Sequence, residues 1–409
     1  MRRTIAFLLS LTYVFLIFAP SLRADFRLLD AIEELGERRY LRPLPARIKA
    51  GPLRVHPLLR NSVTYDSNIL RENPDRRQDV IFNVQPGIIL ELPVNKHIVS
   101  VGYEADFEFF TKRRHHFLND QNQNMFALVD LHFPDWYVNV LEKFSETSSR
   151  AGTTFTERIP RYDQSINPKI GYKWRRTTFE AGFRHYVRDF RRQIHDALDF
   201  QMVEYTGVIF YDLFARLKAL IEYQFAQIDY DDAFERVGTF QQVRAGLEGE
   251  LHPSVLAKIR IGPQFRNYDE SSQTDFYSWV GEAAVDYQIR KNVKVYTGLS
   301  RQAVEATFQN VNFYKEHLAR LGVEYQIRLA WLYFLEGRYY RHDYSEEASL
   351  GGQSGIRRDQ HWGARTGLRY TPREWLELEL AYQFMHRNSN FSTFDYNDNQ
   401  VSFSTALSY

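Results

Sequence analysis

The residues that could do chemistry do not form a recognisable catalytic site. Cysteine is absent, which excludes disulfides, thiolate metal sites and cysteine nucleophiles. The 12 histidines are scattered, and no Gly-x-Ser-x-Gly, His-Glu-x-x-His or Walker-type segment occurs. Only His132 and His361 are expected to point inward from the middle of a strand. We predict no catalytic residue, no metal site and no cofactor, with a Ser/His pair on separate strands of an outer-membrane hydrolase as the alternative.

Charged and aromatic residues at every second position could instead contact a polar solute. Alternate residues of a strand point to opposite faces of the sheet. The residues predicted to line an interior and contact a solute are Glu104, Asp106, Glu108, Lys169, Lys173, Arg184, Tyr186, Arg188, Arg216, Lys218, Arg244, Arg260, Arg266, Tyr296, Arg320, Arg338 and Arg365. Tyrosine and arginine among them offer stacking and hydrogen bonds to sugars.

The predicted inward charges are segregated along the chain. In the first five strands they are mainly acidic, whereas the next strands, from Lys169 to Arg266, carry mainly bases. An acidic arc facing a basic arc would produce a transverse field across a channel. Alternatively, opposite charges on adjacent strands neutralise one another as cross-strand pairs.

The composition favours strands in a membrane. The 52 Lys+Arg and 51 Asp+Glu give a net charge of +1, so no general attraction to nucleic acid is expected. A mean hydropathy of −0.47 excludes a bundle of membrane-spanning helices. Yet 31 Phe, 26 Tyr and 6 Trp are present. A polar average with many aromatic residues is typical of an outer-membrane β-barrel.

The beginning of the chain is predicted to be an export signal and a leader. Two arginines precede a short apolar run, and residues 1–24 therefore read as a secretory signal peptide cleaved near Ala24. Residues 25–52 are predicted to be a periplasmic leader with a short amphipathic helix, which either stays solvated, plugs the lumen or contacts a periplasmic partner. Residues 53–409 are predicted to form the barrel.

The connections predict the number of strands. From residue 53 onward period-two alternation recurs, as in Val99, Val101 and Tyr103. Short turns, such as residues 211–213, alternate with long polar loops, such as residues 344–358. This ordering is typical of closed antiparallel transmembrane β-barrels with periplasmic turns and extracellular loops. We predict an all-β barrel of 18 strands, with 16 as the alternative.

Aromatic residues near strand ends agree with a membrane barrel. Trp136, Trp174, Trp331 and Trp375 each lie near a short turn, where an aromatic girdle belongs. The final strand alternates and ends in aromatic Tyr409. With Phe403 and Leu407, this residue is predicted to form the signal that the outer-membrane assembly machinery recognises.

The first predicted hairpin resembles a known family. Thr64-Tyr65-Asp66-Ser67-Asn68 ends one strand, and Pro86-Gly87 lies in the next. This pattern is similar to the beta-barrel porin 2 family, whose members are often associated with exopolysaccharide loci. The resemblance implies a conduit for a secreted polysaccharide and transfers no functional residue.

Together these observations predict a non-enzymatic channel in the outer membrane of a Gram-negative bacterium. Export of an exopolysaccharide is the leading interpretation, and a general diffusion porin for small polar solutes is the alternative. A closed structural barrel is a third class. The expected partners are outer-membrane lipid and lipopolysaccharide, which the run 112–116 could contact, the barrel assembly machinery and periplasmic polysaccharide-export components.

Overall fold

The computed structural model describes residues 48–408 except 74, 113–114, 116–119, 150–157, 193–197, 232–236, 269–274, 307–310 and 351. The predicted signal peptide, most of the leader with its helix, and Tyr409 lie outside the described residues. Within the described part, no helix is both long and apolar enough to cross a bilayer.

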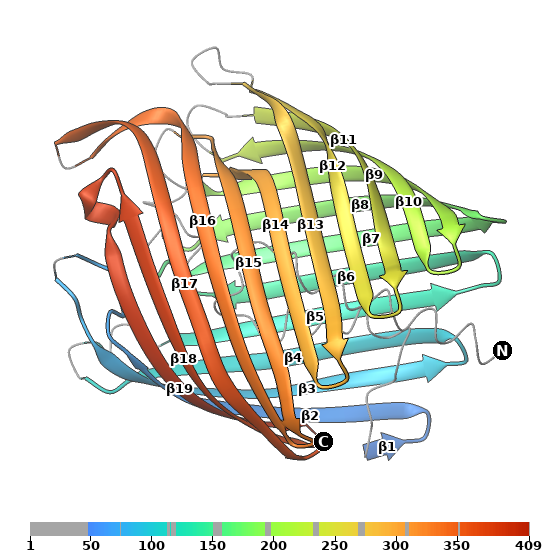
Figure 1. Ribbon diagram of the computed structural model, residues 1–409, viewed down its shortest axis with the longest axis horizontal. Coiled ribbons are helices and arrows are strands. Elements are labelled where there is room, and N and C mark those ends of the chain that lie inside the picture. Colours follow the sequence, from blue (N-terminus) through green and yellow to red (C-terminus); the bar gives the residue numbers. More distant parts are fainter. Residues whose placement is uncertain are drawn as a thin grey trace.

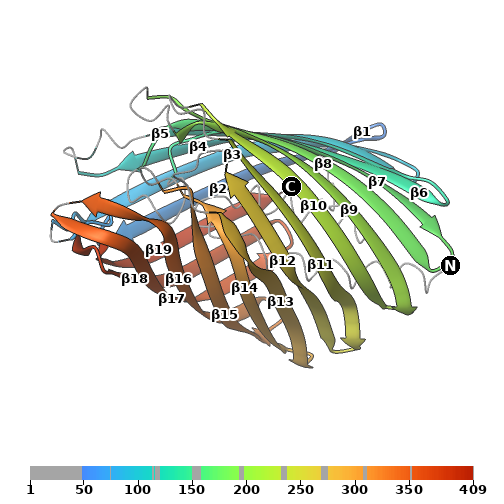
Figure 2. The same cartoon turned by 90° about the horizontal axis from the view of Figure 1, so that it is seen from above.

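In the described residues, eighteen strands, β2 to β19, form one closed antiparallel barrel (Figures 1 and 2). Each strand pairs with the next, and β19 pairs with β2. The elements are β1 (Ile48–Ala50), β2 (Leu53–Asp66), β3 (Asp79–Val94), β4 (His97–Phe110), β5 (Asp120–His132), β6 (Trp136–Thr147), β7 (Arg161–Trp174), β8 (Thr177–Phe190), β9 (Phe200–Phe214), β10 (Leu217–Tyr230), β11 (Val237–His252), β12 (Val255–Tyr268), β13 (Phe276–Arg290), β14 (Val293–Glu305), β15 (Phe313–Arg328), β16 (Trp331–Leu350), β17 (Gln353–Arg373), β18 (Leu376–Ser389), the 3₁₀ turn η5 (Ser392–Phe394) and β19 (Tyr396–Ser408). The predicted all-β barrel of 18 strands is confirmed, and the short β1 pairs with β2 outside it.

The two faces of the wall have opposite chemistry. Large apolar side chains are exposed on the outer face, where Ile221 is 60% and Leu299 54% accessible. Next to Ile221, the carboxylate of Glu222 is only 3% exposed. A water-soluble protein buries the opposite set. The outside of this barrel is therefore suited to lipid, and the inside to water and polar groups.

The closing pair of strands leaves no open sheet edge at the seam. Phe403 lies opposite Val63, and Leu407 lies opposite Leu59. Pairing of the last strand with the first satisfies backbone groups that could not be left bare in a bilayer. The two described residues of the predicted assembly signal thus belong to the strand that closes the barrel.

Two predicted connections differ from the structure. Residues 211–213 lie within β9, and the turn follows at residues 215–216, because Asp212 pairs with Lys218 across the hairpin. Residues 344–358 are not one long loop. Their backbones pair, extending β16 and β17 into a hairpin that projects beyond its neighbours (Figure 1). Tyr344 and Ala348 in this extension are buried in an apolar cluster with Phe391.

Aromatic rings on the inner face cover glycines on neighbouring strands. Tyr296 on β14 lies directly opposite Gly322 on β15, and a Cβ atom at Gly322 would overlap the Tyr296 ring. Tyr137 and Gly171 form the same arrangement on β6 and β7. These glycines are required because their missing side chains make room for the rings.

Candidate functional site

The inner wall of the barrel is the candidate site. The predicted solute-contact residues lie on the polar, inward side of the strands, with Arg216 as the exception. Arg216 lies in the turn between β9 and β10, where it forms an ion pair with Glu250. Lys173, near the end of β7, lies 3.7 Å from Asp212 and is largely exposed. These two cations therefore lie close to the rim that carries the short turns.

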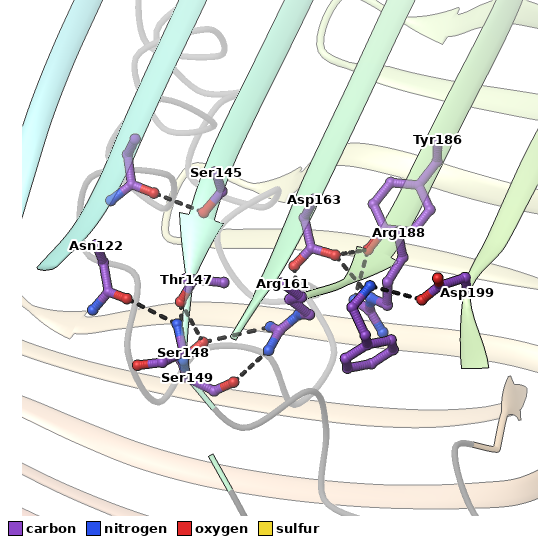
Figure 3. A network of polar contacts seen from close by, with 12 residues as sticks. Asn122, Ser145, Thr147, Ser148, Ser149, Arg161, Asp163, Tyr186, Arg188 and Asp199 are labelled. Carbon is purple, nitrogen blue, oxygen red and sulfur yellow. Dashed lines mark hydrogen bonds and ion pairs between the residues drawn. The ribbon is translucent and has the colours of Figure 1, made fainter. Parts of the chain in front are cut away.

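On β7 and β8, the predicted residues Tyr186 and Arg188 form one hydrogen-bonded cluster with Arg161 and Asp163 (Figure 3). The Asp163 carboxylate accepts hydrogen bonds from the Tyr186 hydroxyl at 2.7 Å and from Arg188 Nε at 2.8 Å. Arg161 donates to the same carboxylate at 2.8 Å. The guanidinium of Arg184 lies 5.4 Å from the centre of the Tyr186 ring. Tyr186 is thus held by protein partners, and its hydroxyl is part of the wall.

Arg161 extends this cluster toward the next strands. It also donates to the backbone oxygen of Ser149, which follows β6. Asn122 on β5 accepts a hydrogen bond from the backbone N–H of Ser148, and Ser145 donates to Asn124 (Figure 3). A row of polar contacts therefore runs along the inner wall from β5 to β8.

A second cluster spans β10 to β13 and contains equal numbers of acids and bases. Arg260 Nη1 lies 2.6 Å from Glu222, and its Nη2 lies 2.9 Å from Glu248. Glu222 also pairs with Arg244, and Lys258 lies 3.1 Å from Glu282. Three carboxylates thus meet three cations. Each buried charge has an opposite charge beside it, as low-dielectric surroundings require.

A third cluster joins β14, β15 and β16. The Tyr296 hydroxyl donates to Glu336 at 2.8 Å, and Arg320 Nε lies 3.5 Å from the same carboxylate. Arg338 also pairs with Glu336. The Arg320 guanidinium lies 5.0 Å from the centre of the Tyr296 ring. The arrangement repeats the tyrosine, carboxylate and arginine combination of the β7–β8 cluster.

These pairs decide between the two interpretations of the charge pattern. Many of the bases in the predicted basic arc are neutralised by carboxylates on the same or adjacent strands, including Asp163, Glu222 and Glu282. In the acidic arc, Glu108 is paired with Arg158. Cross-strand pairing therefore weakens the transverse field that the sequence pattern suggested.

The end of the barrel that carries the long connections has apolar side chains on its inner face. Apolar inward side chains gather there, with Phe200, Ile228, Tyr230 and Phe240 in one buried cluster. Around Phe313 at the start of β15, a further cluster fills the same end of the wall. These two clusters give this end of the inner wall apolar patches beside its polar groups.

An open cavity of about 330 Å³ lies inside the barrel between the first strands and the last. Its uncharged polar lining comes from both groups of strands and includes Ser62, Thr64, Asn83, Gln383, Gln400 and Ser402. Five arginines also line it, namely Arg60, Arg71, Arg158, Arg338 and Arg365. Of the other predicted contact residues, Asp106 and Glu108 contribute to it. The cavity offers many hydrogen bonds without a single dominant charge.

Reasoning from the sequence missed most of this lining. The uncharged residues at alternate positions of β2 and β19 carried the signal, since Ser402 and Gln400 alternate with the outward Phe403 and Val401. Of His56, His342 and His361, which are all buried, only His361 was expected to point inward.

The predicted lipopolysaccharide-contacting run is only partly described. His115 is buried, and its Nδ1 lies 2.6 Å from Asp79. Residues 113–114 and 116 lie outside the described residues. His115 is therefore an internal contact of the wall and not part of an outer surface.

Comparison with known proteins gives a family. A family model described as "Putative beta-barrel porin 2" matches residues 165–409. The chain resembles OccAB3 of Acinetobacter baumannii, with a TM-score of 0.49, 12% identity, and coverage of 87% of this chain and 99% of that one. It resembles Pseudomonas aeruginosa OpdK solved with vanillate, at a TM-score of 0.47, 10% identity and coverage of 87% and 99%. No curated protein matches the chain.

Proposed function

Because this chain belongs to the beta-barrel porin 2 family and lies in the outer membrane of a Gram-negative bacterium, we propose that it is a conduit through which an exopolysaccharide leaves the cell. The family that the first hairpin suggested is confirmed by a match that covers the later strands. We propose passage without chemistry, so the chain acts as a channel and not as an enzyme.

The polar cavity is the observation that supports this proposal. A sugar chain carries hydroxyl groups on every residue, and it needs donors and acceptors that replace water along its path. Neutral side chains such as Gln383, Gln400 and Ser402 supply both. The arginines beside them could bind the acidic groups that many secreted polysaccharides carry.

A porin for small polar solutes is the second candidate. A cavity of about 330 Å³ has the size of a small-molecule site. The small-solute porin and the polysaccharide conduit would use the same path through the barrel and would differ in the solute that passes.

The proposal is tested by narrowing the cavity in living cells. Ser402 lines the cavity, whereas its neighbour Phe403 faces outward. In a strain lacking the gene, Ser402→Trp should restore much less surface polysaccharide than the wild-type gene, and Phe403→Trp should restore it fully. Both barrels must reach the outer membrane in equal amounts. Unchanged polysaccharide export in the deletion strain would reject the conduit.

Periplasmic polysaccharide-export components are the partners that this function would require. The short-turn end of the barrel, where Lys173 and Arg216 are exposed, is the surface at which we expect them to dock.

A further inference from the structure

The inner wall formed by β15, β16 and β17 carries a compact group of metal-ligand side chains. His342, Asp359 and His361 each offer a ligand atom, and these atoms all lie within 4.8 Å of one another. The residues are 0%, 0% and 7% exposed. We propose that this group binds one divalent transition-metal ion of the Zn²⁺ class, because imidazole nitrogens with one carboxylate suit such ions.

The strand register brings these residues together. His342 on β16 lies directly opposite Asp359 on β17, and Glu316 on β15 lies directly opposite His342. His361 follows Asp359 by two residues, so both side chains face the lumen. The three neighbouring strands therefore present one row of acid, histidine and acid, with a second histidine diagonally beside it.

Glu316 orients the first histidine as a metal site requires. The His342 Nε2–H donates to the Glu316 carboxylate over 3.0 Å, and both side chains are fully buried. Ligating histidines in metal sites commonly donate their other nitrogen to a carboxylate in this way, which fixes the ring and its tautomer. In this arrangement Nδ1 of His342 is the nitrogen that would bind the metal.

His361 supplies a second observation that points to a ligand. Among the described residues, its Nε2 atom is buried and has no hydrogen-bond partner. A buried polar atom without a partner is unfavourable, and a bound ion is one way to satisfy it. The ring also lies close to His342, with 4.7 Å between the ring centres. A metal ion between the two rings would satisfy this nitrogen.

The charged groups around the site influence its affinity for a metal ion. Arg357 donates to both oxygens of Asp359, at 3.0 and 2.6 Å. Each carboxylate oxygen has a second lone pair, so Asp359 can bind a metal while it keeps Arg357. The Arg357 guanidinium also lies over the ring of Phe394, 3.4 Å from its centre. Because the positive charge of Arg357 repels a metal cation, we expect weaker metal affinity than at a structural zinc site made of cysteines.

The site adjoins the polar cavity, which His361 also lines. Three protein ligands leave a coordination position for water or for an oxygen of the solute. The metal would thus bind at the wall of the pathway. The metal site does not depend on which solute passes through the barrel.

Metal binding by the purified full-length barrel tests the proposal. After treatment with a chelator, the detergent-solubilised protein is titrated with Zn²⁺ by calorimetry and with Co²⁺ by visible absorption. We expect one ion per chain and Co²⁺ bands typical of nitrogen and oxygen ligands. His361→Gln should weaken Zn²⁺ binding at least ~10-fold, and Glu316→Gln should weaken it ~10–100-fold, as for other residues that orient a ligand.

His132→Gln is the matched control. His132 also faces the lumen and pairs with a carboxylate, Asp130, at 3.0 Å. It belongs to no such group of ligands among the described residues, so its replacement should leave Zn²⁺ affinity unchanged. A folded barrel migrates faster on a gel before heating than after heating. This difference shows that each variant is folded. Absence of stoichiometric binding by the wild type, or equal affinity in folded His361→Gln, would overturn the proposal.

Discussion

Glu222 is the residue whose replacement tests the charge networks of the lumen most sharply. Its carboxylate lies between Arg244 and Arg260. The surrounding cluster also contains Glu248, Glu282 and Lys258, and its charges sum to zero. Glu222→Gln keeps the shape of the side chain and leaves one cation in excess. We expect this change to destabilise the folded barrel.

The magnitude follows from burial. Removing one partner of a buried ion pair costs about 3–5 kcal/mol, because the remaining charge keeps its desolvation penalty. The loss corresponds to about two to four powers of ten in the unfolding equilibrium, at 1.36 kcal/mol for each factor of ten. Urea unfolding in lipid vesicles, followed by tryptophan fluorescence, measures this free energy of unfolding.

Two further variants separate charge balance from a general effect of mutation. Glu324→Gln removes a partner of Lys294 at 2.8 Å, but Glu324 is 33% exposed, so we expect a loss below about 1 kcal/mol. Adding Arg244→Gln to Glu222→Gln restores neutrality and should recover part of the stability. Two results would refute a role for charge balance in stability. One is a loss of unfolding free energy in Glu222→Gln no larger than that in Glu324→Gln. The other is a loss in the double variant equal to the sum of the losses of its two single variants.

Further predictions concern the two faces of the wall. Leu299→Arg places a charge on the outer face near the middle of β14 and should cost about 2–4 kcal/mol, whereas the inward Ser300→Arg should cost clearly less; urea unfolding in vesicles compares them, and equal losses would contradict the assignment of faces. Gly322→Ala should displace the Tyr296 ring and break its 2.8 Å bond to Glu336. Its unfolding free energy should fall by more than that of Gly337→Ala, where a Cβ atom meets nothing within 4 Å.

The barrel itself could be predicted because lipid and water impose a simple pattern on strands. Alternation along Val99, Val101 and Tyr103 identifies the outer face without knowledge of any partner strand, since all three are exposed in the structure. Hence the all-β class, the strand number and the inward side of most charged residues followed from the sequence.

The exact turns were harder to predict because pairing depends on backbone hydrogen bonds. Residues 344–358 are polar and contain glycines, which favours a loop. In the structure Glu347 pairs with Ile356 and Ala348 with Gly355, and burial of Tyr344 and Ala348 stabilises the extension. This apolar cluster joins segments far apart in the sequence, so no local pattern reveals it.

The site could be predicted only in part, because its composition depends on register. Parity places Arg260 and Glu222 on the same face but does not place them 2.6 Å apart. It also does not place His342 opposite Asp359. Uncharged cavity residues such as Gln383 were not predicted, because an amide side chain carries no charge that marks its position along a strand.

Conductance of the purified full-length barrel in a planar lipid bilayer distinguishes a polysaccharide conduit from a small-solute porin and from a closed barrel. If the barrel is a conduit, it should give discrete open steps that are blocked by the polysaccharide of the parent strain and reduced by Ser402→Trp. Steady conductance that the polysaccharide leaves unchanged, together with uptake of simple sugars, would replace the conduit with the small-solute porin. Folded protein that gave no conductance at all would contradict the channel itself.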